Sequence, residues 1–150
     1  MDVTTRIERA LTQAVGSAEE AGLCEDVSNI MKQANPALPV LNAAGAVSLI
    51  ETAALMDRCA VVLTNDSGLM HIAAARGRSL VAVFGPTVRQ FGFFPTGSRA
   101  VVVEHPNLDC RPCTPIGLPS CPQGHFRCMN EIPAARVTEA ARALMARSAV

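Results

Sequence analysis

Two apolar runs separated by a short helical stretch constrain the fold of this chain most. The runs are AVVLTN, residues 60–65, and SLVAVFG, residues 79–85, and neither shows a clean alternation of polar and apolar residues. Such runs are typical of strands buried on both faces of a parallel sheet. The segment between them is long enough for one short helix. The pattern therefore predicts a right-handed βαβ unit with parallel strands.

Further strands and helices are expected on both sides of this unit. Residues 39–45 and 99–105 predict additional strands, and residues 17–34, 48–59 and 133–146 predict helices. Ser48 stands three residues before Glu51, which is the spacing of a capping box. Pro133 suits the first position of the last helix. The apolar faces expected on the first and last of these helices are Leu23, Val27, Ile30, Met31 and Ala34, and Val137, Ala140, Ala141 and Leu144.

Composition fits an α/β fold. Hydrophobic residues make up 49% of the 150 residues, and aromatic residues make up only 3%. We expect one domain over residues 1–150, because this length can bury a core of its own. Lys and Arg balance Asp and Glu at 13 each, and Trp and Tyr are absent. We therefore expect no nucleic-acid partner, since such binding relies on a basic surface and on aromatic stacking.

Polar residues follow the first strand of the βαβ unit at the point where its helix begins. Asp66, Ser67 and Gly68 stand there, and His71 follows one turn later. Parallel sheets bind ligands beyond the carboxyl ends of their strands, and a helix N-terminus attracts anions. Gly68 would let a phosphate approach the backbone, while Asp66 would shape the turn or accept sugar hydroxyls. The alternative is an ordinary helix N-cap with a solvated histidine, but the combination favours a site for a diphosphate.

The same segment resembles a known family. Residues 63–87, LTNDSGLMHIAAARGRSLVAVFGPT, are similar to the signature of glycosyltransferase family nine, the lipopolysaccharide heptosyltransferases, in their Asp-Ser/Thr-Gly-x-x-His and Phe-Gly-Pro-Thr elements. The turn at residues 16–20 and the helices at 45–59 and 130–145 extend the resemblance over residues 14–147. It implies that the chain corresponds to the C-terminal half of a GT-B glycosyltransferase. That half is a Rossmann-like parallel sheet with flanking helices, and it binds a nucleotide-sugar such as ADP-heptose.

The resemblance also implies roles for individual residues. Asp66, Ser67, Gly68 and His71 would face the diphosphate and sugar of the donor, and Glu19 would bind the ribose. Glu19 has an alternative role as a first-turn carboxylate that complements a helix dipole. In the family the catalytic base is an aspartate of an N-terminal domain that we cannot match here. We therefore name no catalytic base, and we expect an N-terminal half-domain as a partner and no transfer by this chain alone.

Four cysteines form a second candidate site within a Pro- and Gly-rich loop at residues 105–130. Cys110, Cys113, Cys121 and Cys128 have the spacing C-x2-C-x7-C-x6-C, with two histidines nearby. Thiolates at such spacings suit a structural Zn²⁺ ion, and the alternative is a set of reduced or redox-linked thiols. We expect no cofactor to be required for catalysis.

Three functions follow from these patterns. The first is the donor-binding domain of a heptosyltransferase-like enzyme that transfers sugar to the lipopolysaccharide core, its acceptor. The second is a nucleotide-sugar binder without catalysis, and the third is an interaction module stabilised by zinc in the cysteine loop. The N-terminus has no apolar stretch that would make a secretory signal. We therefore expect a cytoplasmic protein, with a peripheral position at the inner membrane as the alternative.

Overall fold

The computed structural model describes residues 12–96 and 99–148. The chain divides between residues 58 and 59 into two compact units, and each is described by itself. That residues 1–150 form one domain therefore stays a prediction. Among the described residues, no helix is both long and apolar enough to cross a membrane.

The first unit contains a pair of parallel strands and two helices. Strand β1 (Thr12–Ala14) pairs with β2 (Val40–Asn42), and α2 (Ala21–Ala34) connects them and packs against both. Helix α3 (Leu49–Asp57) follows β2. The strand predicted at residues 39–45 and both predicted helices are thus confirmed.

The start of α3 follows the predicted capping box. The Ser48 hydroxyl accepts the Glu51 N–H at 3.3 Å, and the Glu51 carboxylate accepts the Ser48 N–H at 2.7 Å. These bonds satisfy two N–H groups that a helix otherwise leaves without partners. They also lower the pKa of the Glu51 carboxyl, because a carboxylate that accepts hydrogen bonds is stabilised in its charged form.

The predicted apolar face of α2 is wrong at four of its five residues, because Leu23, Val27, Ile30 and Ala34 are exposed and only Met31 is half-buried. Leu23 and Ile30 are each 65% exposed, whereas Ser28 is fully buried. The Ser28 hydroxyl donates to the carbonyl of Cys24 at 2.7 Å, so its burial leaves no polar atom without a partner. Periodicity shows that a helix is amphipathic, but it does not show which side the rest of the fold covers.

The second unit is built on a three-stranded parallel sheet in the order β3-β4-β5. These strands are β3 (Val62–Asn65), β4 (Leu80–Phe84) and β5 (Ala100–Glu104), and the short helix α4 (Gly68–Ala75) joins the first two. The predicted βαβ unit is confirmed. Because all three strands run in one direction, their carboxyl ends meet at the same edge of the sheet.

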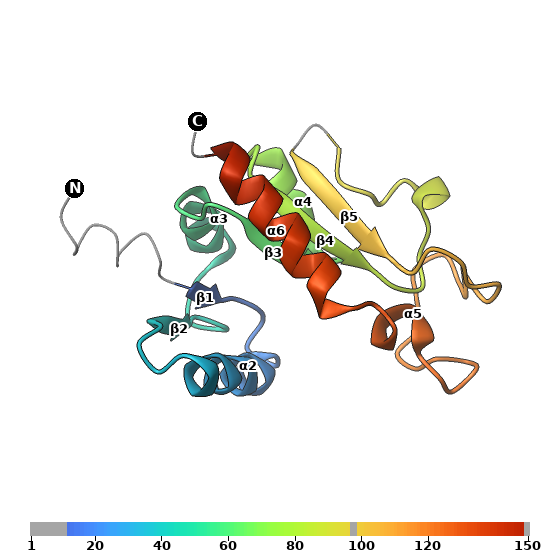
Figure 1. The fold of residues 1–150 in the computed structure, drawn as a ribbon, viewed down its shortest axis with the longest axis horizontal. Coiled ribbons are helices and arrows are strands. Elements are labelled where there is room, and N and C mark those ends of the chain that lie inside the picture. The colour runs from blue at the N-terminus through green and yellow to red at the C-terminus, as the bar shows by residue number, and fades with distance from the viewer. Residues whose placement is uncertain (1–11, 97–98, 149–150) are drawn as a thin grey trace. The chain divides into compact units, whose positions relative to one another are not determined.

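Helix α6 (Ala134–Ser148) packs against this sheet, and Figure 1 shows it lying across β4. Pro133 directly precedes the helix, whereas we had expected it to be the first helical residue. The predicted inward face of α6 is confirmed. A buried cluster joins the helix to β4 and β5 through Val81, Val103, Ala141 and Leu144, with Val137 and Ala140 packed against it. Burying each large side chain stabilises the fold by about 1.5–3 kcal/mol.

Strand β4 is buried almost completely, as predicted, whereas β3 is not. The side chain of Leu63 is 56% exposed, and burial alternates along β3. Within the sheet, β3 is an edge strand and β4 is central. An edge strand has fewer neighbours to cover it, so its apolar sequence overstates its burial.

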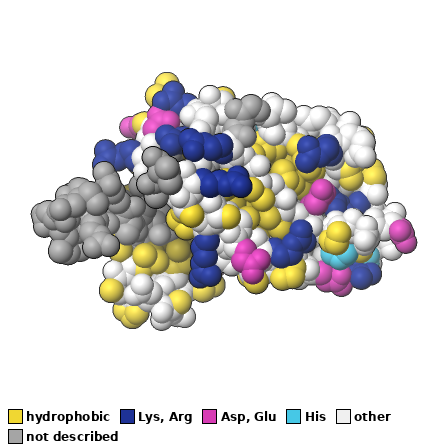
Figure 2. All heavy atoms as spheres, turned by 45° about the horizontal axis from the view of Figure 1, so that its top comes forward, with side chains coloured by type: hydrophobic (Ala, Val, Ile, Leu, Met, Phe, Trp, Pro, Cys, Tyr) yellow, Lys and Arg dark blue, Asp and Glu magenta, His cyan; other side chains and the backbone are white. Residues whose placement is uncertain are grey.

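The loop at residues 105–130 is less irregular than its composition suggests. It ends in a short helix, α5 (Arg127–Asn130), which precedes α6. On the face shown in Figure 2, Lys and Arg side chains lie among hydrophobic and scattered acidic ones.

Candidate functional site

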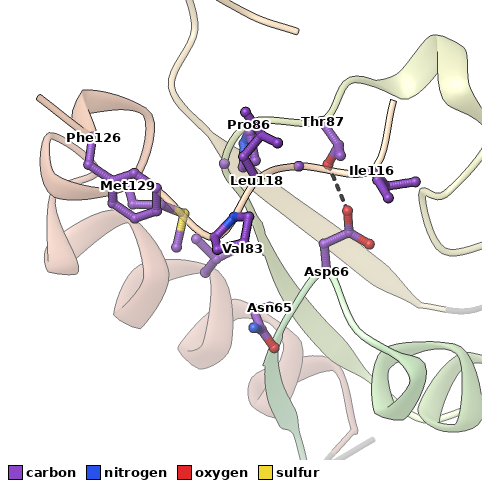
Figure 3. Close-up of a pocket in the computed structure, with 12 residues that line it drawn as sticks. Asn65, Asp66, Val83, Pro86, Thr87, Ile116, Leu118, Phe126 and Met129 are labelled. Atoms are coloured by element: carbon purple, nitrogen blue, oxygen red, sulfur yellow. Dashed lines mark hydrogen bonds between the residues drawn. The ribbon is translucent and has the colours of Figure 1, made fainter. Parts of the chain in front are cut away.

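A pocket of about 410 Å³ opens at the carboxyl ends of β3 and β4. Its polar side is formed by the residues that follow these strands, and its apolar side is formed by the loop at residues 105–130 (Figure 3). The lining residues are Asn65, Asp66, Val83, Gly85, Pro86, Thr87, Ile116, Gly117, Leu118, Pro119, Phe126 and Met129. The pocket thus lies where parallel sheets commonly bind ligands.

Asp66 is the one carboxylate among the described residues that line this pocket. Its Oδ2 atom accepts the hydroxyl of Thr87 at 2.7 Å, as Figure 3 shows. We had expected Asp66 either to shape its turn by accepting N–H groups or to accept sugar hydroxyls, and the second alternative stays a prediction. The structure gives it a hydroxyl partner from the segment after β4 instead, because the parallel strands bring these two segments to one edge.

Helix α4 begins without a side-chain cap. Ser67 occupies the N-cap position, yet its hydroxyl makes no bond to the helix and lies 3.3 Å from the hydroxyl of Thr64. In the first turn, the Met70 N–H donates to the Ser67 carbonyl at 3.1 Å, whereas those of Gly68 and Leu69 remain open to an anion. Gly68 is exposed, and a Cβ atom added there would meet nothing within 4 Å. A ligand could approach the backbone at this position.

The side chain of His71 is also exposed on α4. This residue is not among those that line the pocket, and neither are Ser67 and Gly68. The structure thus places Asp66 in the pocket and the other three residues on the adjoining first turn of α4. That these four residues bind a donor stays a prediction.

Glu19 lies in the first unit, ahead of α2. Its pKa is lowered, first by its own backbone N–H and then by the Ser17 hydroxyl. Because α2 begins at Ala21 and has no acidic residue in its first turn, the alternative role as a first-turn carboxylate is wrong. That Glu19 binds a ribose stays a prediction.

The glycine of the Phe-Gly-Pro-Thr element, Gly85, has a packing role. A Cβ atom added to Gly85 would lie 2.7 Å from the Sδ atom of Met129. The absence of a side chain therefore lets α5 pack closely against the end of β4. This approach brings Met129 into the apolar side of the pocket.

Arg111 links the pocket to the end of β5, and no sequence pattern identified it. Its guanidinium donates to Glu104 Oε2 at 2.7 Å, to the Thr87 carbonyl at 2.8 Å and to the His105 carbonyl at 2.6 Å. The Arg111 side chain is only 6% exposed. Such a buried charge needs these partners, because an unpaired charge in the interior is strongly destabilising.

The four loop cysteines are all free thiols. The Cys113 thiol donates to the carbonyl of Cys110 at 3.2 Å. Burial raises the pKa of Cys113 and of Cys128, whereas backbone N–H groups, that of Phe126 first, lower the pKa of Cys121. The loop thus gives chemically similar thiols different environments.

Both histidines of this loop have other partners. His105 Nε2 lies 3.3 Å from a carboxylate oxygen of Glu131, and His125 Nδ1 accepts the N–H of Arg127 at 3.1 Å. Over residues 12–96 and 99–148, no three His, Cys, Asp or Glu side chains are grouped as a metal site would require. That Zn²⁺ binds the four cysteines stays a prediction.

The sequence and the fold both match one family of known proteins. Residues 15–119 match the model of glycosyltransferase family 9 (heptosyltransferase). Lipooligosaccharide heptosyltransferase 2 of Campylobacter jejuni is 31% identical over 133 residues, which are 89% of this chain and 40% of that protein. Lipopolysaccharide heptosyltransferase 2 of Escherichia coli is 48% identical over 50 residues, which are 33% of this chain and 14% of that protein.

Two solved structures share the fold. The family 9 glycosyltransferase of Veillonella parvula superposes with a TM-score of 0.72 and 22% identity, over 98% of this chain and 42% of that one. ADP-heptose lipopolysaccharide heptosyltransferase II of Escherichia coli superposes with a TM-score of 0.70 and 27% identity, over 97% of this chain and 41% of that one. These structures confirm the Rossmann-like architecture. The chain spans about 40% of the Campylobacter jejuni relative and of both solved structures, and it belongs to glycosyltransferase family 9.

Proposed function

We propose that this chain is the donor-binding part of a heptosyltransferase-like glycosyltransferase and that it binds a nucleotide-activated sugar such as ADP-heptose. Family membership supports sugar transfer as the reaction. The structurally similar Escherichia coli protein is an ADP-heptose lipopolysaccharide heptosyltransferase, which supports this choice of donor. The acceptor in this proposal is the lipopolysaccharide core, and the architecture is that of a GT-B half.

The observation that carries the proposal is the position of Asp66, in a pocket beside the uncapped start of α4. The open N–H groups of that helix suit the diphosphate of the donor, since a helix N-terminus carries partial positive charge. A carboxylate repels phosphate but accepts hydrogen bonds from hydroxyl groups. Asp66 therefore suits the sugar, and the space above Gly68 suits the diphosphate.

The same arrangement can assist departure of the nucleotide. As the bond between the sugar and the diphosphate breaks, negative charge grows on the diphosphate, and fixed N–H groups stabilise that charge. In an inverting transfer, a base removes the proton of the acceptor hydroxyl. Asp66, the one carboxylate in the described pocket lining, is assigned here to the hydroxyl groups of the donor sugar and not to the acceptor. We therefore assign the base to an N-terminal half-domain partner.

We place this activity in the cytoplasm, with a peripheral position at the inner membrane as the alternative. All six cysteines are free thiols, which fits a reducing compartment. A nucleotide-sugar binder without catalysis would use the same pocket, so binding and transfer must be tested separately.

Calorimetric titration of the chain with ADP and ADP-heptose tests donor binding. Gly68→Val should weaken the binding of both ligands at least about tenfold, because the new side chain fills the space at the open N–H groups. A Cβ atom at this exposed position meets nothing within 4 Å, so we expect the fold to tolerate the substitution. Ala75→Val is the matched control, since it places the same side chain on the exposed far end of α4.

Equal affinities of the wild-type chain and the Gly68→Val variant would contradict the proposed site. Transfer is then assayed with ADP-heptose and a heptose-deficient lipopolysaccharide acceptor. We expect no transfer by the chain alone, because the proposal assigns Asp66, the one carboxylate in the described pocket lining, to the sugar and the base to the N-terminal partner. We expect partial activity when the N-terminal half of a family member is added. Donor binding without transfer in either case would favour the binder without catalysis.

A further inference from the structure

Thr87 occupies an unusual position between the pocket and the interior. Its side chain is only 2% exposed, yet the residue lines the pocket. The hydroxyl lies 2.7 Å from Asp66 Oδ2. Because an ionised carboxylate can only accept hydrogen bonds, the hydroxyl must be the donor in this pair. The buried hydroxyl of Thr87 is therefore directed at a single oxygen of Asp66.

The backbone of Thr87 is held as firmly as its side chain. The Thr87 carbonyl accepts a hydrogen bond from Arg111 at 2.8 Å, and Arg111 also bonds Glu104 and the His105 carbonyl at the end of β5. The bond to its carbonyl thus fixes the backbone of Thr87 beside the end of β5, and the buried hydroxyl has Asp66 Oδ2 as its partner. A chain of hydrogen bonds therefore connects Glu104 at the end of β5, through Arg111 and Thr87, to the carboxylate of Asp66.

The bond from Thr87 leaves the other oxygen of Asp66 available. Within the described part of the chain, Asp66 Oδ1 makes no hydrogen bond, and Asp66 borders the pocket (Figure 3). An oxygen held at a fixed place can accept a hydroxyl of a ligand with little loss of side-chain entropy. A diphosphate offers no donor to such an oxygen, whereas a sugar offers several hydroxyl groups.

We propose that Thr87 is a positioning residue that fixes the carboxylate of Asp66 to receive hydroxyl groups of the donor sugar. This inference rests on the proposed function and makes it more specific. It separates the two parts of the donor: the start of α4 binds the diphosphate, and the pair of Thr87 and Asp66 selects the sugar. Thr87 acts through Asp66 and need not touch the ligand.

Two substitutions of Thr87 test this role with ADP and ADP-heptose as separate ligands. Thr87→Val keeps the shape of the side chain and removes its hydroxyl group. It should weaken the binding of ADP-heptose about tenfold. Its affinity for ADP, which has no donor sugar beyond the diphosphate, should stay within about twofold. Thr87→Ser keeps the hydroxyl and should bind both ligands as the wild type does.

The inference is wrong if Thr87→Val binds ADP-heptose as tightly as the wild type, or if it weakens ADP and ADP-heptose equally. A loss of the same size in Thr87→Ser would also overturn it, because packing and not the hydroxyl would then matter. Failure of the proposed function has a different signature, namely a wild-type chain that binds neither ligand.

Nuclear magnetic resonance of the chain without ligand tests the positioning role independently of affinity. Thr87→Val should shift the amide resonances of Asp66 and Ser67, whereas Thr87→Ser should leave them near their wild-type positions. Unchanged resonances in Thr87→Val would show that Thr87 does not position Asp66, whatever the chain binds.

Discussion

Replacement of Arg111 by methionine should destabilise the second unit strongly. Methionine retains an unbranched apolar side chain but removes the guanidinium, which donates to Glu104 and to the carbonyls of Thr87 and His105. The Arg111 side chain is 6% exposed, so water cannot easily replace these bonds. The loss therefore includes unpaired carbonyl groups as well as the ion pair.

The magnitude follows from these contacts. Removal of one partner of a fully buried ion pair costs about 3–5 kcal/mol. Glu104 is 36% exposed, and water can solvate it after the substitution, so the lower end of this range applies. We expect a loss of about 3 kcal/mol in the free energy of unfolding. For a chain of 150 residues this corresponds to a decrease in melting temperature of about 6–12 °C.

Thermal and urea unfolding followed by circular dichroism measure this effect. Arg136→Met is the matched control, because Arg136 is exposed and donates one hydrogen bond, at 3.0 Å, to the Glu104 carbonyl. We expect the control to change the melting temperature by less than about 2 °C. If the Arg111→Met variant had the same melting temperature as the control, the hydrogen bonds of Arg111 would not support the fold.

Three further predictions concern the loop and the first unit. In a metal-free chain, Cys121 should react with iodoacetamide faster than Cys113 and Cys128 at neutral pH, because its lowered pKa yields more thiolate. Its reactivity should also begin at a lower pH than theirs. Mass spectrometry of the labelled peptides measures the order. If the loop binds zinc, elemental analysis should find one equivalent and a chelator should speed alkylation of all four loop cysteines; less than a tenth of an equivalent contradicts the zinc prediction. Gly45→Ala should destabilise the chain by at least about 1 kcal/mol, because Gly45 has φ +68° and the new Cβ would lie 2.7 Å from the Cα of Ala18; an unchanged urea midpoint would contradict this.

Local patterns were sufficient to predict much of the fold. The capping box of Ser48 and Glu51 depends on residues three apart, and the inward face of α6 depends on helical spacing within one segment. Both predictions are confirmed because the interactions that decide them lie within a single element or on a single face of it. Burial of β3 and the covered face of α2 depend on what packs against them, and there the predictions were partly wrong.

The candidate site was predictable only where its residues are close in sequence. Asp66, Ser67 and Gly68 follow one strand, and the structure places them at its carboxyl end. The bond between Thr87 and Asp66 spans 21 residues, and that between Arg111 and Thr87 spans 24 residues. No periodicity marks such pairs. The one available signal was Thr87 itself, which stands in the Phe-Gly-Pro-Thr element, while nothing distinguished Arg111 from other arginines.

The central claim is that the pocket beside α4 binds a nucleotide-activated sugar. Titration of the isotope-labelled chain with ADP-heptose, followed by amide resonances, tests it most directly. We expect saturable shifts at Ser67, Gly68 and Leu69 and at Gly85 and Thr87, and smaller shifts at the first two positions in Gly68→Val at the same ligand concentration. Absence of saturable shifts, or shifts confined to residues away from the pocket and the start of α4, would contradict the claim.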